Sequence, residues 1–396
     1  MAKSLSLFRI SAALLPCATI AATLPSCILD EEEPNDIAQF GHDWQDDGDD
    51  ESKLAAFEEE DEPEDVEPDD VDAKGKKSSG NPSPQAGAAC TTVATFKYAT
   101  SGDVTTASIN TTVVAWFTKG SYTVRMTGPS RTFSAGVTGV PSVTTTMWIR
   151  TLATPFDPVT MGTTARSAWL NAARVVNCVT GTSDILAVAY EYIEGASKDA
   201  AYANGADFHD YLGLSWDPAD GNIVAADATQ LGRIDCSGFL RLVFGFRANF
   251  LYSGLEAKIP MSFYVPGTLT RASKDQYQSG PGKIIVPFRT QPTGAVAFNG
   301  TPTTTELSAI QVGDIVFFDS SCDYAVSSPS CGTDWTSISH TGIYVGQDSA
   351  NNARFLSSRS TANGPTVANT GGWSVFNNAT GISGTYPKRF RGARRF

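Results

Sequence analysis

Alternation of apolar and polar residues dominates residues 91–160, a stretch that is also rich in Thr, Val, Ser and Gly. The clearest runs are Thr111–Phe117 and Tyr122–Met126, and Trp148–Arg150 continues the pattern. Period-two alternation places successive side chains on opposite faces of an extended backbone. This stretch therefore predicts short β-strands joined by turns.

The period of the apolar residues changes to that of a helix after Thr164. The residues that share one face of this first predicted helix are Trp169, Ala172, Ala173 and Val176. A second helix is predicted over 184–194, with Ser183 or Thr182 as its N-cap. Its predicted buried positions are Ile185, Val188, Ala189 and Tyr192.

Uninterrupted apolar runs mark the buried elements of the C-terminal part. Phe239–Phe246 predicts a buried helix. Ile315–Phe318, Ile343–Val345 and Phe355–Leu356 are rich in β-branched and aromatic residues and predict successive strands of one sheet. The order of helices and strands favours an α+β fold with a β-rich N-terminal extension.

The first 27 residues have the organisation of an export signal. Lys3 and Arg9 precede the apolar run Ile10–Leu24, whose length suits a signal sequence better than a membrane span. The run ends in Leu24-Pro25-Ser26-Cys27, which resembles a bacterial lipobox, although Pro25 is unusual there. We expect an exported protein, with Cys27 lipidated at a bacterial membrane. The alternative is an ordinary signal peptide cleaved nearby, which would leave the protein extracellular.

Acidic residues are concentrated in one segment, because residues 30–79 hold 22 Asp and Glu against four Lys. Residues 28–88 are poor in apolar side chains and predict a disordered, solubilising tether. No basic stripe with interleaved aromatics occurs before the last nine residues, which disfavours a nucleic-acid partner. The three His, with no HExxH and no paired CxxC, give no metal site, and we expect no cofactor.

Export implies an oxidising compartment, in which cysteines tend to form disulfides. Apart from Cys17 in the signal and Cys27, the chain holds Cys90, Cys178, Cys236, Cys322 and Cys331. We expect Cys322 to pair with Cys331 across a Ser-rich loop, and Cys90 with Cys178. Four cysteines allow three pairings, so this connectivity is a hypothesis. It leaves Cys236 unpaired.

An unpaired cysteine at the start of a buried helix is a candidate nucleophile. An ordinary thiol has a pKa of about 8.5, and helix N–H groups or a neighbouring imidazolium favour the thiolate. His42 lies in the acidic segment and His209 precedes the helix. His340 begins a strand in which Gly342, Tyr344 and Gly346 alternate with it onto one face, where the glycines leave room for a ligand.

Four motifs occur in one order: Tyr211-Leu212-Gly213, Asp235-Cys236-Ser237-Gly238-Phe239, Val312–Phe318 and His340–Gly346. Together they resemble the NlpC-type cell-wall cysteine peptidases, over roughly residues 184–396. The resemblance implies a papain-like α+β fold, with helices packed on an antiparallel sheet. It also implies hydrolysis of an amide in peptidoglycan stem peptides, commonly between γ-D-glutamyl and a diamino acid, without a cofactor.

The resemblance assigns roles to the matching residues. Cys236 would be the nucleophile and His340 the base, while Tyr211, Asp235 and Ser237 would line the substrate or oxyanion site. Two of these residues have structural alternatives, because Asp235 suits a helix N-cap and Tyr211 suits a packed aromatic.

The chain departs from the family pattern in two places. The long separation of the predicted nucleophile and base suggests that residues 247–305 are an insertion near the cleft. The polar residue that orients the catalytic imidazole is usually His, Asn or Gln, but the matching position here is Ser357. A serine supplies no charge, and His209 or another group is the alternative.

The sequence thus predicts a signal (1–27), a tether (28–88), a β-rich accessory region (89–180) and an NlpC-like peptidase domain (181–396). The leading hypothesis is a lipid-anchored thiol hydrolase that binds and cleaves peptidoglycan peptides. The alternatives are a non-catalytic wall-binding module on the same fold and a thiol acyltransferase or amidase acting on another amide. The basic run Lys388–Phe396 predicts a solvated edge strand, or else a contact with anionic polymer or lipid headgroups.

Overall fold

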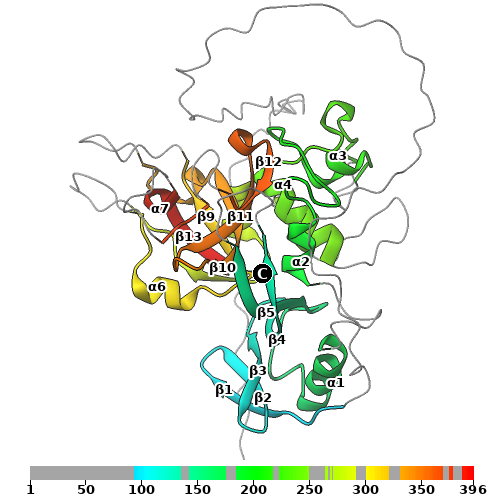
Figure 1. Ribbon diagram of the computed structural model, residues 1–396, viewed down its shortest axis with the longest axis vertical. Helices are drawn as coiled ribbons and strands as arrows, with labels where there is room; N and C mark the ends of the chain where they lie inside the picture. The colour runs from blue at the N-terminus through cyan, green and yellow to red at the C-terminus, as the bar shows by residue number, and fades with distance from the viewer. Residues whose placement is uncertain are drawn as a thin grey trace, which may run out of the picture. The chain divides into compact units, whose positions relative to one another are not determined.

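The computed structural model describes eleven stretches of the chain: residues 93–134, 142–174, 184–216, 223–248, 264–265, 268–269, 271–290, 300–320, 331–368, 374–377 and 386–396. The predicted signal and tether lie outside them. The described part is an α+β structure with a five-stranded and a six-stranded antiparallel sheet (Figure 1).

The N-terminal sheet is a meander in which each strand pairs with the next along the chain. Its strands are β1 (Lys97–Ser101), β2 (Val104–Ile109), β3 (Thr112–Thr118), β4 (Thr123–Phe133) and β5 (Val143–Thr151). The alternating pattern predicted strands in this stretch, and the structure confirms them.

The second sheet has the strand order β12-β11-β10-β9-β13-β8. Its strands are β8 (Lys283–Val286), β9 (Ile315–Phe318), β10 (His340–Gln347), β11 (Ala353–Arg359), β12 (Gly364–Thr366) and β13 (Phe390–Arg395). The three strands predicted from apolar runs are β9, β10 and β11, which lie side by side. A separate hairpin consists of β6 (Tyr264–Val265) and β7 (Thr268–Leu269).

The helices are short. The α-helices are α1 (Thr163–Ala173), α2 (Ile185–Tyr190), α3 (Phe208–Leu212), α4 (Cys236–Leu240), α5 (Ser273–Ser279), α6 (Thr304–Ala309) and α7 (Tyr386–Arg389). The 3-10 turns are η1 (Ala228–Gln230), η3 (Trp335–Ser337) and η4 (Ser360–Ala362). The π-helix η2 (Arg241–Arg247) continues α4, so the predicted buried helix is confirmed. In the described residues no helix is long and apolar enough to cross a membrane.

Both faces of the six-stranded sheet are covered, which explains the uninterrupted apolar run of β9. Ile315 and Phe317 pack into the cluster that contains α2 and α4, whereas Val316 and Phe318 pack into a second cluster on the opposite face. All four side chains are fully buried. A strand that is covered on both faces has no polar face to alternate with.

Strands β4 and β5 connect the two sheets (Figure 1). Phe133 and Ile149 belong to the same core cluster as α2 and α4, whereas Met126 packs with α1 and the first strands. At the opposite end of the chain, the carbonyl of Phe396 accepts a hydrogen bond of 2.7 Å from the backbone N–H of Thr123. The described part of the β-rich stretch therefore shares a core with the C-terminal sheet, and the predicted division near residue 180 stays a prediction.

The C-terminal basic run was predicted wrongly. Strand β13 is an interior strand between β9 and β8, and every residue in it is buried. Arg391 and Arg395 form ion pairs with Asp319 and Asp314, so they are neither solvated nor available to an anionic polymer. The sequence showed the arginines but not the carboxylates that the fold brings to them.

Two helix predictions also need correction. In α1 the buried positions are Arg166, Leu170 and Ala173, while Ala172 is exposed. The helix α2 is shorter than predicted, and its N-cap is Asp184, which accepts a hydrogen bond of 2.9 Å from the N–H of Ala187. The four residues predicted to be buried in and after α2 are buried.

The described part of residues 247–305 contributes α5 and the edge strand β8, and the expectation that this stretch is an insertion stays a prediction. In β10 a bulge between Tyr344 and Gly346 shifts the register by one residue. Gly346 therefore leaves the face that it was predicted to share with His340, because one extra residue reverses the alternation.

Candidate functional site

Cys236 is the first residue of α4, and the chain around it is tightly fixed. Asp235 is the N-cap and accepts a hydrogen bond of 2.6 Å from the N–H of Gly238. A Cβ on Gly238 would lie 2.5 Å from the carbonyl oxygen of Ala206, so only glycine lets α4 pack this closely on the preceding chain. The cap and the glycine together set the position of the thiol.

Cys236 is a thiol that is not part of a disulfide, and it is partly exposed. Its Sγ lies 3.5 Å from Oγ of Ser273 on α5 and 4.0 Å from the backbone oxygen of Ser339. Ser339 directly precedes His340, so the fold brings the predicted nucleophile to the beginning of the strand that carries the predicted base. The sequence analysis did not identify Ser273 as a neighbour of the thiol.

His340 is buried at the start of β10, where the rings of Phe318 and Tyr386 lie 6.0 and 5.3 Å from it. Its Nε2 lies 3.1 Å from Oγ of Ser357 on β11, the serine at the predicted third position. Burial, reinforced by the charges of Arg359 and Arg389, lowers the pKa of His340 to about 3. The imidazole is therefore neutral at neutral pH. Ser357 contacts Nε2, so Nδ1 is the ring nitrogen that it does not contact.

Asp235 and Ser237 lie on either side of the thiol in sequence and bond to each other. Ser237 Oγ donates a hydrogen bond of 2.9 Å to Oδ1 of Asp235. Burial raises the pKa of Asp235 to about 7, against the opposing effect of the hydrogen bonds from Gly238 and Ser237. The N-cap alternative for Asp235 is thus present in the structure, whatever further role the residue has.

Gln276 ties α5 to the nucleophile helix, since its Nε2 donates a hydrogen bond of 3.0 Å to the carbonyl of Ser237. Ser273, Gln276 and Tyr277 form the buried face of α5. Their spacing of three and four residues was visible in the sequence, and two polar residues on a buried helical face are the signal that could have identified them.

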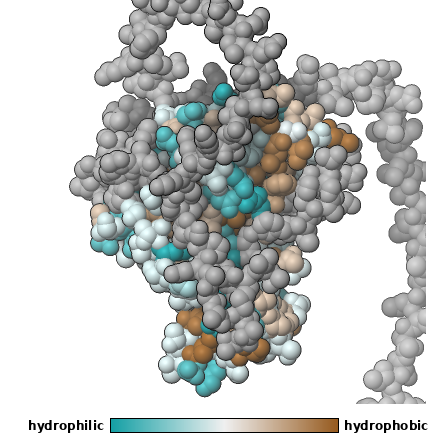
Figure 2. Space-filling view, turned by 45° about the vertical axis from the view of Figure 1, so that its right-hand side comes forward, coloured by the Kyte–Doolittle hydropathy of each residue, from teal (hydrophilic) through white to brown (hydrophobic). Residues whose placement is uncertain are grey.

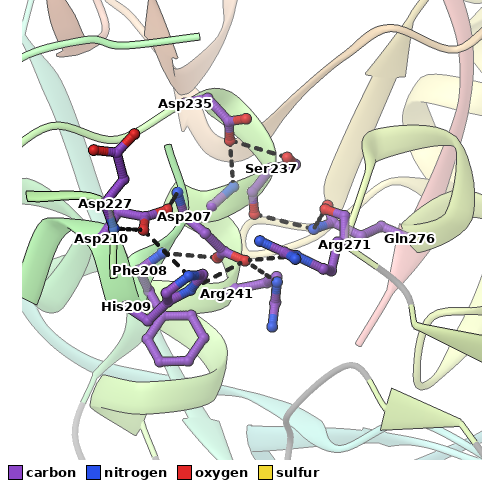
Figure 3. A network of polar contacts seen from close by, with 11 residues as sticks. Asp207, Phe208, His209, Asp210, Asp227, Asp235, Ser237, Arg241, Arg271 and Gln276 are labelled. Carbon is purple, nitrogen blue, oxygen red and sulfur yellow. Dashed lines mark hydrogen bonds and ion pairs between the residues drawn. The ribbon is translucent and has the colours of Figure 1, made fainter. Parts of the chain in front are cut away.

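A network of charged side chains lies below α4 (Figure 3). Arg241 bonds to Asp207, and Nε of Arg271 lies 3.2 Å from the same carboxylate. Burial opposes ionisation of Asp207, but the charges of Arg241, Arg271 and His209 outweigh it and lower the pKa of that carboxyl. The network links α3 to the helix that carries Cys236.

His209 belongs to this network and not to the surroundings of His340. Its Nε2 lies 3.2 Å from Oδ1 of Asp210, and its Nδ1 lies 3.7 Å from Oδ2 of Asp207. Burial lowers the pKa of His209 although both carboxylates act in the opposite direction. The group next to His340 is therefore Ser357, and His209 does not take the position of the third residue.

Tyr211 on α3 is half-buried and donates a hydrogen bond of 3.1 Å to the carbonyl of Lys198. Its ring packs edge-to-face on Tyr192, with 5.6 Å between the ring centroids. No contact within the described stretches joins Tyr211 to Cys236 or His340. The observed contacts fit the alternative in which Tyr211 is a packed aromatic residue.

The remaining predicted cysteines mostly lie outside the described residues, as Cys27, Cys90, Cys178 and Cys322 all do. Cys331 is described and is disulfide-bonded. Both predicted pairings, and lipidation of Cys27, stay predictions.

Among the described side chains, no group of three or more His, Cys, Asp or Glu could hold a metal ion. Comparison of the chain with protein-family models, with curated proteins and with solved structures gave no match. The functional argument therefore depends on the geometry of the site and on the motifs in the sequence.

Proposed function

We propose that this protein is an exported thiol hydrolase that cleaves amide bonds in peptidoglycan stem peptides. The observation that supports it best is the position of the Cys236 thiol, 4.0 Å from the carbonyl of the residue before His340. The imidazole is itself held through Nε2 by Ser357. A thiol, an imidazole and a polar group that orients the imidazole are the parts that acyl-enzyme chemistry requires.

In the proposed reaction, Nδ1 of His340 accepts the thiol proton while Sγ attacks the scissile carbonyl. The tetrahedral oxyanion would be bound by N–H groups of the first turn of α4, of which Gly238 is already capped by Asp235. Collapse of this intermediate forms a thioester, and the proton on the imidazole passes to the leaving amine. Water then hydrolyses the thioester and restores the thiol.

The low pKa of the buried imidazole argues against a resting thiolate–imidazolium pair. With a pKa of about 3, His340 is a neutral base across the pH range of an exported protein. The thiol would give up its proton only during attack, when the developing charge on sulfur and oxygen stabilises the imidazolium. Neutral Ser357 fits this scheme, because it orients the ring without adding a charge.

The substrate class comes from the resemblance of the four motifs to the NlpC-type cell-wall peptidases. We propose the γ-D-glutamyl to diamino-acid bond as the scissile amide. We also propose that lipid on Cys27 holds the protein at the bacterial envelope, close to this substrate.

The test is to incubate the purified full chain with peptidoglycan and to count new amino groups by labelling and mass spectrometry. Wild type should release them, and Cys236→Ala and His340→Ala should each lose activity by orders of magnitude. Unchanged activity in Cys236→Ala would exclude the mechanism.

Ser357 and Ser358 provide a matched pair of variants, since both are buried and both make a hydrogen bond through Oγ. Ser358 donates to the carbonyl of Ile234 and not to His340. Ser357→Ala should lower kcat/KM about 10- to 100-fold, the loss that is typical when the partner that orients a metal-ligating imidazole is removed. Ser358→Ala should leave kcat/KM close to wild type once the enzyme is folded.

Binding, labelling and product analysis on the same substrate distinguish the hydrolase from the two alternative functions. Undiminished binding to peptidoglycan, with no cleavage and no labelling of Cys236 by iodoacetamide, would indicate a wall-binding module. Products in which the acyl group is carried by an added amine instead of water would indicate a thiol acyltransferase.

A further inference from the structure

Ser273, the first residue of α5, is a buried polar residue at the thiol. Hydrophilic residues are prominent on the face shown in Figure 2, in contact with solvent, whereas Ser273 is 5 % exposed. Its Oγ lies 3.5 Å from Sγ of Cys236. Among the described residues the sulfur is the hydrogen-bond partner of this hydroxyl, so the contact with the thiol compensates for its burial.

The hydroxyl of Ser273 does not serve to begin the helix. A serine at the start of a helix usually bonds to a nearby backbone N–H, which is a structural reason for its presence there. The N-cap of α5 is Ala272, and no side chain caps this helix. A capping role therefore does not account for the hydroxyl, which contacts the thiol instead.

The position of Ser273 is fixed from two sides. Gln276, one turn further along α5, donates a hydrogen bond of 3.0 Å to the carbonyl of Ser237 on α4 (Figure 3). Near the other end of α5, the guanidinium of Arg394 on β13 donates a hydrogen bond of 2.7 Å to the carbonyl of Tyr277. These bonds tie α5 to the helix of the thiol and to the sheet, so the hydroxyl is held at the sulfur before a substrate binds.

The thiol needs a hydrogen-bond donor at the moment when it loses its proton. In the proposed reaction this proton passes to His340, and negative charge develops on Sγ as it attacks. With a pKa of about 3 the imidazole is neutral beforehand, so it does not supply a positive charge that would stabilise the sulfur in advance. A hydroxyl can donate to a developing anion, and a hydrogen bond to a charged acceptor is stronger than one to a neutral acceptor.

We propose that Ser273 is a catalytic residue that donates a hydrogen bond to the sulfur of Cys236 while this sulfur carries negative charge. The S–H bond breaks and its proton passes to the imidazole, the bond from sulfur to the carbonyl carbon forms, and the O–H bond of Ser273 stays intact. The same donor stabilises the sulfur again when water expels it from the thioester. This inference rests on the thiol chemistry of the proposed function but not on its substrate.

The first test is the rate at which iodoacetamide alkylates Cys236 in the full chain, followed against pH by mass spectrometry of the peptide that contains Cys236. A hydrogen bond to the thiolate lowers the pKa of the thiol, so Ser273→Ala should raise that pKa by about one unit or more. Ser279→Ala is the control, because it removes a hydroxyl from the last residue of the same helix. It should leave the pKa of Cys236 at its wild-type value.

Threonine and valine at position 273 separate the loss of the donor from a change in packing. Their side chains have nearly the same shape, but only threonine has a hydroxyl. The pKa of Cys236 should therefore be lower in Ser273→Thr than in Ser273→Val by about one unit. Asp235, Asp275 and His340 are titratable groups on the elements around the thiol, and they are the same in both variants, so their titration affects both profiles alike.

Hydrolysis of peptidoglycan is the second test. Ser273→Ala should lower kcat about tenfold with little change in KM, because the hydrogen bond strengthens only when charge develops on the sulfur. The proposal is overturned if the pKa of Cys236 is the same in wild type and Ser273→Ala, or the same in Ser273→Thr and Ser273→Val. If wild type does not cleave peptidoglycan but Ser273→Ala still raises the pKa, the proposed substrate is wrong and the role of Ser273 is supported.

Discussion

Arginine is buried in both regions of the molecule, but its partners differ. In the C-terminal region four buried guanidinium groups are paired with carboxylates, Arg241 with Asp207, Arg354 with Asp348, Arg391 with Asp319 and Arg395 with Asp314, whereas buried Arg394 donates to backbone carbonyls. In the β-rich region Arg166 is buried over the ring of Tyr98 and half-buried Arg125 lies over Trp116, whereas buried Arg131 pairs with Asp184.

An arginine in a buried ion pair has a structural role, whereas an arginine on a ring face can still bind a ligand. In a buried ion pair the two charges neutralise each other, and the pair fixes two elements relative to each other. A guanidinium on a ring face keeps its N–H donors and its net charge. Buried ion pairs of this kind give the C-terminal region the rigid frame that a catalytic site needs.

The largest effect is expected from breaking a complete pair in the C-terminal region. Arg391 and Asp319 are both fully buried and lie 2.8 Å apart. Arg391→Met leaves the carboxylate of Asp319 uncompensated and should destabilise the fold by about 3–5 kcal/mol. The midpoint of urea denaturation at pH 7 measures this loss, and Arg391→Met together with Asp319→Leu should recover much of it.

An intermediate effect is expected at Asp235, a buried acid of the C-terminal region without an ion-pair partner in the described residues. Its pKa is raised from 3.8 to about 7, so its protonated form stabilises the fold at low pH and this contribution is lost as the pH rises through about 7. Asp235→Asn keeps an oxygen for the N–H of Gly238 and should gain stability relative to wild type between pH 5 and pH 8.

Thermal unfolding at several pH values tests the prediction for Asp235. Asp235→Ala is the control, because it loses the helix cap and should be less stable by about 1 kcal/mol even at low pH. A difference between Asp235→Asn and wild type that does not change with pH would contradict a raised pKa.

The smallest effect is expected from the same Arg-to-Met change in the β-rich region. Arg166 is 8 % exposed and stacks on Tyr98 at 4.6 Å, without an ion pair among the described residues. Because no carboxylate is left behind, Arg166→Met should cost only about 2 kcal/mol, the contribution of a desolvated cation–π contact. Urea denaturation of Arg166→Met and Arg391→Met under the same conditions compares the two losses of stability. Equal losses in the two variants would contradict the prediction.

Local pattern was enough to predict much of the fold. The alternation in Tyr122–Met126 and the apolar run Ile315–Phe318 both became strands, because side-chain periodicity is fixed by backbone geometry. The helix after Asp235 was also predicted. In contrast, the cap of α2 and the buried face of α1 were missed, since both depend on neighbours that are distant in sequence.

The candidate site was also predictable in part. Motif order indicated Cys236, His340 and Ser357, and the structure places Ser357 beside His340. Ser273 and Gln276 were not predicted, because they reach the thiol and its helix only through packing of α5 on α4. Tyr211 was assigned to the site by resemblance, yet its observed contacts are with Lys198 and Tyr192.

The sequence by itself determined the α+β class, the strands and the residue types that can perform thiol chemistry, because these follow from periodicity and from chemical identity. Only the tertiary structure decided which charges are paired. The same basic residues that predict a solvated edge strand at Arg391–Arg395 are buried against Asp319 and Asp314, while Arg174 makes no ion pair among the described residues. The strength of a charge–charge interaction depends on the distance between the two groups in the folded protein, and the pattern of residues along the sequence does not give that distance.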